Sequence, residues 1–334
     1  GALVKTGAGN LTLTGDFNYL TRTHVSAGTL TIGDGGTSGT LGDGDVTNDG
    51  TLAFNRSDDV MVSHDITGTG LVRKLGAGML ELTGTNSYTG GTAIHAGTLS
   101  IFADHNIGAA SGALSLNGGT LRTTASFGMT RAVTLTGNGT FDVEGTTLTL
   151  NGTVGGSGNL VKEGNGVLFL LADNNYTGAT IISAGTLQVG YDQSTGSVGA
   201  GPVTTNRMLS FHRSGDFTVS NAISGTGQLR HYGSGTMVLT GDNSYTGMTT
   251  IADGTLQVGN GGTTGSLGSG DIANYGSLVF NRSDTVSVVN RIAEAGSLTQ
   301  AGSGHLVLTG ASFYTGGTFV NAGTLSVNGS IIGD

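Results

Sequence analysis

The 334-residue chain contains no cysteine, no tryptophan and a single proline, and only 10% of its residues are charged. Without cysteine, neither disulfides nor thiolate metal sites are available to hold the fold. The near absence of proline excludes a collagen triple helix, even though 64 residues are glycine. Hydrophobic residues make up 36% of the chain, which is too many for a disordered, self-repelling coil. We therefore expect a folded chain without covalent cross-links.

Positive charge and long apolar runs are also scarce. The 13 Lys and Arg residues against 22 Asp and Glu give a net charge of −9. This balance argues against a nucleic-acid partner, because phosphate binding needs clustered cations. The longest apolar run, residues 167–172, is far shorter than the roughly 20 residues of a transmembrane helix. The chain starts Gly-Ala-Leu-Val-Lys without a basic and then an apolar region, so we expect a signal peptide to be absent or removed. The first residue is not Met, which suggests a piece of a longer chain.

Internal repetition dominates the sequence. Five copies of the pattern G-x-G-x-L-x-L-T-G-x-x-x-Y-T-G-x-T-x-I-x-A-G-T-L-x-V align without gaps, and the glycine before the final T-L marks each copy. The copies span residues 7–32, 76–101, 164–189, 233–258 and 302–327. The interval from Gly97 to Gly185 is longer than the other three, which are equal, and this predicts one extra coil within residues 98–185. We expect a single repeat domain over residues 1–334, built of 69-residue units.

Apolar residues alternate with other residues inside each copy. In the second copy, Leu80 and Leu82 flank Glu81, and the same parity recurs in the other copies. Period 2 places alternate side chains on opposite faces, which predicts strands with one dry face. Short threonine-rich strands between Gly, Asn, Asp and Ser turns favour an all-β, right-handed parallel β-helix, because stacked coils leave sheet edges only at the ends. If each unit forms three equal coils, the solenoid has roughly 14 coils, whereas a propeller would need longer blades.

The second copy, Gly76-Ala-Gly-Met-Leu-Glu-Leu-Thr-Gly-Thr-Asn-Ser-Tyr-Thr-Gly-Gly-Thr-Ala-Ile-His-Ala-Gly-Thr-Leu99, closely resembles the autotransporter-associated β-strand repeat of Gram-negative bacteria. The first copy departs from the pattern, because Leu20 replaces the Thr that follows the tyrosine. The resemblance implies a β-helical passenger of type V secretion, exported across the outer membrane and displayed on the bacterial cell surface. In such proteins a signal peptide precedes the passenger and an outer-membrane barrel follows it. Passengers of this kind are commonly adhesins or self-associating factors.

One repeat position holds a tyrosine in every copy, and these tyrosines are candidates for an interaction surface. They are Tyr19, Tyr88, Tyr176, Tyr245 and Tyr314. A tyrosine presents a flat apolar face and a polar tip, which suits contact with a glycan or a protein. The alternative interpretation is packing inside a turn. If consecutive tyrosines lie three coils apart, about 14 Å separates them, and their rings cannot stack on one another.

A second candidate surface comes from charged residues between the copies. The segments 50–58 and 276–284 share the ending Phe-Asn-Arg-Ser-Asp, and a degenerate version covers residues 208–215. Alternating parity predicts that Arg and Asp point the same way in an extended segment. The pairs then form either a solvated turn or an exposed stripe through which two copies of the chain adhere. The residues are Arg56, Asp58, Arg213, Arg282 and Asp284.

Patterns typical of catalysis or metal binding are sparse. The closest group of acids, Asp142, Glu144 and Glu163, has no evident partner set, and no H-E-x-x-H, G-x-S-x-G or P-loop pattern occurs. We therefore expect no catalytic residue, no metal site and no cofactor.

Three functional hypotheses follow. The first is a non-catalytic, surface-displayed adhesin that binds a host surface protein or glycan, or another copy of itself. The second is a passive β-helical stalk that presents an effector region from elsewhere in the protein. The third is an enzyme acting on polysaccharides, because neighbouring coils of a parallel β-helix can bring carboxylates together in a groove.

Overall fold

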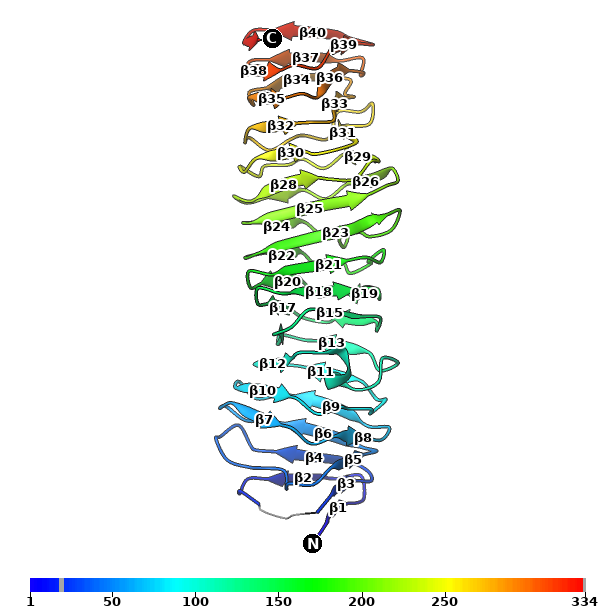
Figure 1. Ribbon diagram of the computed structural model, residues 1–334, viewed down its shortest axis with the longest axis vertical. Coiled ribbons are helices and arrows are strands. Elements are labelled where there is room, and N and C mark those ends of the chain that lie inside the picture. The colour runs from blue at the N-terminus through cyan, green and yellow to red at the C-terminus, as the bar shows by residue number, and fades with distance from the viewer. Residues whose placement is uncertain (18–20, 333–334) are drawn as a thin grey trace. The chain divides into compact units, whose positions relative to one another are not determined.

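The computed structural model describes residues 1–17 and 21–332 and shows an all-β chain. Within these residues a single short 3₁₀ helix, η1 (Asp104–Ile107), interrupts the strands. The chain divides into two compact units, and each is described by itself. The first comprises residues 1–168 and 174–178, and the second comprises residues 169–173 and 179–334. In each unit the strands stack coil upon coil (Figure 1).

The first unit contains three long sheets and a strand pair. One sheet contains β1 (Leu3–Lys5), β3 (Thr23–Val25), β5 (Val46–Asn48) and β8 (Ile66–Thr67). The next contains β2 (Asn10–Leu13), β4 (Thr29–Ile32), β6 (Thr51–Phe54), β9 (Leu71–Lys74), β11 (Thr92–Ile94), β13 (Leu114–Leu116), β16 (Val133–Leu135) and β19 (Val154–Gly156). The third contains β7 (Val60–Val62), β10 (Met79–Leu82), β12 (Thr98–Ile101), β14 (Thr120–Thr123), β17 (Gly139–Val143) and β20 (Leu160–Glu163). The pair is β15 (Phe127–Met129) and β18 (Thr147–Leu150).

The second unit repeats this arrangement, and β21 (Val167–Leu170) contributes residues to both units. Its largest sheet contains β23 (Thr186–Gln193), β25 (Met208–Arg213), β28 (Gln228–His231), β30 (Thr249–Ile251), β32 (Ile272–Asn274), β35 (Ile292–Glu294), β38 (Ala311–Tyr314) and β41 (Ser330–Ile331). Another contains β26 (Phe217–Val219), β29 (Thr236–Leu239), β31 (Thr255–Val258), β33 (Ser277–Phe280), β36 (Ser297–Gln300) and β39 (Thr318–Val320). The remaining strands are β22 (Thr180–Ile182), β24 (Val203–Thr205) and β27 (Ile223–Ser224), and β34 (Thr285–Val288), β37 (His305–Leu308) and β40 (Thr324–Val327).

Strands pair in parallel with their counterparts in the next coil, so like side chains form columns. In the second unit Met237, Leu256, Leu278 and Leu298 are consecutive register partners, and all four are fully buried. Burying a side chain of this size contributes about 1.5–3 kcal/mol relative to leaving it exposed. The alternation read from the sequence therefore gives a dry interior, as the prediction of a parallel β-helix required.

Coils are shorter than the sequence analysis assumed. Register partners in adjacent strands lie closer in sequence than three equal coils per repeat would place them, as in Leu80 with Leu99 and Leu209 with Leu229. Over the described residues the strands make about 16 turns, so the prediction of roughly 14 was too low. The error came from dividing each repeat into three coils of equal length.

Each repeat is three coils plus one further strand. In the second unit, three coils lead from Leu187 through Leu209 and Leu229 to Thr249 in the same sheet. Residues 250–256 then carry the chain onto another sheet, so that Leu256, the repeat equivalent of Leu187, lies in β31. The first unit behaves alike, since Leu11 lies in β2 and its equivalent Leu80 lies in β10 of a different sheet. Equivalent residues of consecutive repeats therefore do not form a row on one face.

Candidate binding site

The repeat tyrosines lie inside the coils. Tyr88, Tyr176, Tyr245 and Tyr314 are 0–1% exposed, and Tyr19 lies outside the described residues. The hydroxyl of Tyr88 is 2.6 Å from Thr92 Oγ1, and Tyr245 and Tyr314 make the same contact with a threonine four residues on, at 2.7 and 2.6 Å. Burial raises the pKa of all three phenols. Buried in this way, these four tyrosines cannot contact a ligand while the coils are folded, and they do not form the expected surface row.

The arginines of the second candidate surface hold loops in place. Arg56 donates through Nε and Nη2 to both carboxylate oxygens of Asp58, at 2.8 and 2.6 Å, and through Nη1 to the carbonyl of Gly39 at 2.6 Å. Arg282 binds Asp284 in the same bidentate way and donates to the carbonyl of Gly265. The paired guanidinium groups hold the pKa of both carboxyls below its usual range.

This arrangement leaves little of the arginines at the surface, since the side chains of Arg56 and Arg282 are 11% and 12% exposed. Arg213 donates to the carbonyls of Gly196 and Ser194, and its guanidinium lies 4.6 Å from the ring centroid of Phe217. The Arg and Asp side chains of the two pairs lie on the same side of their segment, where they bind each other. Within the described residues these arginines form no exposed charged stripe, because each guanidinium binds its own loop.

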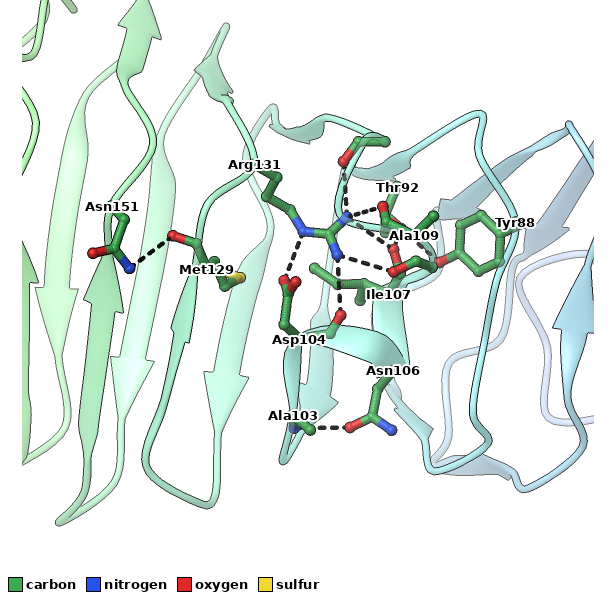
Figure 2. Close-up of polar contacts among 12 residues, drawn as sticks. Tyr88, Thr92, Ala103, Asp104, Asn106, Ile107, Ala109, Met129, Arg131 and Asn151 are labelled. Carbon is green, nitrogen blue, oxygen red and sulfur yellow. Dashed lines mark hydrogen bonds and ion pairs between the residues drawn. The ribbon is translucent and has the colours of Figure 1, made fainter.

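A buried arginine organises the loop that contains η1. Arg131 Nε donates to Asp104 Oδ1 at 2.8 Å, and its Nη atoms donate to five backbone carbonyls (Figure 2). The Arg131 side chain is fully buried. Arg131 was not predicted as a structural residue, because it stands where other repeats have a shorter side chain. There Asn221 or Asn290 binds loop carbonyls with one amide.

A further buried position recurs in every repeat and was also missed. Each copy places a hydrogen-bond donor two residues before the first glycine of the G-x-G pattern, and the five residues are Lys5, Lys74, Lys162, His231 and Gln300. All are at most 6% exposed. Lys74 Nζ donates to the carbonyls of Gly76 and Ala96, and Gln300 Nε2 donates to Gly302 and Gly304 at 2.8 and 3.1 Å. Burial lowers the pKa of Lys74 and of Lys162 from 10.5 to about 8.

The acids considered for catalysis are partly neutralised. Arg122 donates through Nε to Asp142 Oδ2 at 2.9 Å and lies 3.6 Å from Glu144. Glu163 is the register partner of Asp142 on the next coil. Over the described residues, no group of three or more His, Asp or Glu side chains is placed to hold a metal ion.

Exposed aromatic side chains gather at one place, on the largest sheet of the second unit. The ring centroids of Phe169 and Tyr191 are 5.7 Å apart, those of Tyr191 and His212 are 5.5 Å apart, and those of His212 and Tyr232 are 4.8 Å apart. All three contacts are edge-to-face. Tyr191 is 59% exposed and Tyr232 is 47% exposed. Tyr191 lies on β23, His212 on β25 and Tyr232 directly after β28, so each comes from a different coil.

A bulge sets the position of Tyr191. The register between β23 and β25 shifts after Val189, where Gly190 and Asp192 have φ values of 76° and 54°. Bulges redirect side chains and are common beside functional sites. A non-glycine residue at positive φ such as Asp192 is uncommon. Val189 pairs with Phe211, so without the bulge Gly190 would lie opposite His212. The register shift brings Tyr191 beside His212 instead.

A polar column runs beside the aromatic one. Gln188, Ser210 and Arg230 are register partners on β23, β25 and β28. Together with Tyr191, His212 and Tyr232 they line a hollow of about 380 Å³, which we call the aromatic groove. The guanidinium of Arg230 lies 4.6 Å from the ring centroid of Tyr232. Its buried Nε has no hydrogen-bond partner, and no ion pair of Arg230 is found within residues 1–17 and 21–332.

Comparison with known proteins agrees with this architecture. The passenger-associated-transport-repeat model matches residues 3–32, 72–101, 160–189, 232–258 and 298–327, which are the five repeats with their flanking strands. The chain thus carries five copies of this autotransporter passenger repeat. Members of this repeat family are secreted through the outer membrane and displayed on the bacterial surface. No solved structure matches the chain.

A curated relative extends the comparison. The chain is 39% identical over 198 residues to the adhesin BmaC autotransporter of Brucella suis biovar 1 (strain 1330). The match covers 59% of the chain and 6% of the relative, so the chain spans only a small part of that protein's length. No helix in the described part of the chain is long and apolar enough to cross a membrane.

Proposed function

We propose that this passenger segment acts as a non-catalytic adhesin that binds a molecule on a host surface. The observation that carries the proposal is the 39% identity to a protein named as an autotransporter adhesin. A passenger displayed on the cell surface meets other surfaces first, and adhesion needs only exposed binding groups on a stable scaffold.

The placement of side chains supports contact through a local site. The repeat tyrosines pack in the interior and the repeat arginines bind within their loops, so the repeats do not by themselves form an adhesive surface. Exposed aromatic and unpaired polar groups coincide in the aromatic groove. Catalysis by the acids is disfavoured, because Arg122 already binds Asp142 and Glu144.

Surface display on a non-adherent bacterium tests the proposal. Cells displaying the complete passenger should attach to cultured host cells more than cells displaying a passenger that lacks residues 1–334. Equal attachment of the two strains would refute adhesion by this segment. Sedimentation of the purified chain at increasing concentration examines self-association, and a monomer that still supports attachment agrees with host binding.

A passive stalk is the second candidate, and the structural role of most repeat positions favours it. Removing residues 30–98 joins Thr29 to Leu99 at equivalent points of two repeats. Every later coil then moves by one sheet around the solenoid, since each repeat is three coils and one strand. Both a stalk and an adhesin should tolerate this deletion. Substitutions in the aromatic groove distinguish the two, because a stalk should tolerate them and an adhesin that binds there should lose attachment.

A further inference from the structure

We propose, on the basis of the adhesive function inferred above, that the aromatic groove binds an acidic oligosaccharide. Arg230 holds a carboxylate of the sugar, and Tyr191 and Tyr232 contact the apolar faces of the sugar rings. Three features of the groove support this assignment.

The first feature is an arginine prepared for an anion. Arg230 is half-buried, its Nε is buried without a partner, and the ring of Tyr232 holds its guanidinium at 4.6 Å. No hydrogen bond or ion pair of its Nη atoms is found within residues 1–17 and 21–332. A carboxylate accepts hydrogen bonds from a guanidinium, so the Nη atoms suit a bound carboxylate. The ligand should therefore carry a negative charge.

The second feature is the pairing of aromatic and polar columns. Tyr191 and Tyr232 expose flat apolar surface beside polar tips, which suits the mixed apolar and hydroxylated faces of a sugar. Gln188 and Ser210 stand beside them and supply amide and hydroxyl groups for sugar hydroxyls.

The third feature is repetition along successive coils. Tyr191, His212 and Tyr232 come from three consecutive coils, and neighbouring coils are about 4.8 Å apart. Rings at this spacing form a track that suits a chain of several sugar units.

The same sheet supplies a matched control. Arg291 also lies over an aromatic ring, 5.2 Å from the centroid of Phe313. Arg291, however, has Asp271 at 3.8 Å, and its side chain is 51% exposed. Substitution of Arg291 therefore removes a similar arginine without removing an unpaired donor.

Calorimetric titration with a hexamer of galacturonic acid tests the proposal, with its methyl ester and hexaglutamate as comparison ligands. The wild-type chain should bind the acid hexamer, and affinity should fall with added salt. R230Q should lower that affinity about 10-fold or more, since one charge-assisted hydrogen bond is worth about 1.5–3 kcal/mol. Y232A should lower it several-fold, because it removes an aromatic face that the sugar ring contacts. R291Q and F313A should change it less than about 2-fold. Circular dichroism of each variant verifies the fold.

Four results would overturn the proposal: no binding of the acid hexamer, equal binding of its methyl ester, equal binding of hexaglutamate with the same dependence on Arg230, or an equal loss in R291Q. The attachment assay separates this inference from the adhesive function. If displaying cells attach and R230Q attaches equally well, the groove is not the contact site and the adhesive function stands. If the hexamer binds through Arg230 but displaying cells do not attach, the groove assignment holds and adhesion fails.

Discussion

Replacement of Lys74 by methionine or glutamine tests the role of the buried donor at the coil corner. Lys74 is 2% exposed, and its Nζ donates to the carbonyl of Gly76 on its own coil and of Ala96 on the next coil. Methionine fills similar space but donates nothing, so two buried carbonyls lose a partner. At about 1–3 kcal/mol for each unsatisfied group, K74M should lower the free energy of unfolding by about 2–6 kcal/mol.

Glutamine is the matched control, because the chain already uses it at this position. Gln300 occupies the equivalent site and binds the carbonyls of Gly302 and Gly304. K74Q should therefore lose less than about half of what K74M loses. Chemical denaturation followed by circular dichroism measures both, and hydrogen exchange of the amides at residues 74–98 locates the loss. If K74M is as stable as the wild type, or more stable, the corner donor does not stabilise the coil and the reasoning fails.

Three further predictions concern the interior. The folded pKa of Lys74 is about 8, below the unfolded value of 10.5, so the unfolded chain binds more protons between these values and stability should rise with pH from about 8 toward 10. Stability should fall again above about pH 10, because burial raises the pKa of Tyr88 and unfolding then releases a proton. Denaturation across this pH range, with K74Q for comparison, measures both trends. Tyr88→Phe should lose about 1–2 kcal/mol with its hydrogen bond, whereas Tyr275→Phe, at an exposed tyrosine, should lose nothing measurable in the same denaturation assay. Gly254→Ala should lose more than about 2 kcal/mol, because Gly254 has φ +62° and an added Cβ would overlap the carbonyls of Gly233 and Gly235, while Gly262→Ala, with open space around it, should be neutral by thermal melting.

The sequence predicted the fold class well because the stacking signal is local. Alternation in segments such as 80–82 identifies inward residues without any knowledge of the coil length, and the buried leucine columns follow from it. The number of coils was harder to predict. The repeat period hides the length of a single coil, because coils of unequal length and an added strand produce the same period as three equal coils.

The candidate site was largely missed for the same reason. Repetition drew attention to Tyr88 and Arg56, but these recurring positions are ones that the coils and their loops need for their own packing. Tyr191, His212 and Tyr232 fall outside the repeat pattern and recur at coil spacing, which becomes visible only once the register is known. The bulge at Gly190 also shifts the strand register, and the periodic sequence pattern does not predict such a shift.

A disulfide between neighbouring coils tests the stacking register most directly, because the chain has no cysteine of its own. Thr204 and Ser224 are register partners on β24 and β27, and their hydroxyl oxygens are 3.3 Å apart. The double variant T204C/S224C should form an intramolecular disulfide on mild oxidation while the circular dichroism spectrum stays unchanged. T204C/T226C, displaced by two residues along the strand, should cross-link far more slowly, since bridged residues need closely spaced Cα atoms. Equal cross-linking of the two variants, or none in T204C/S224C, would contradict a solenoid with coils of this length.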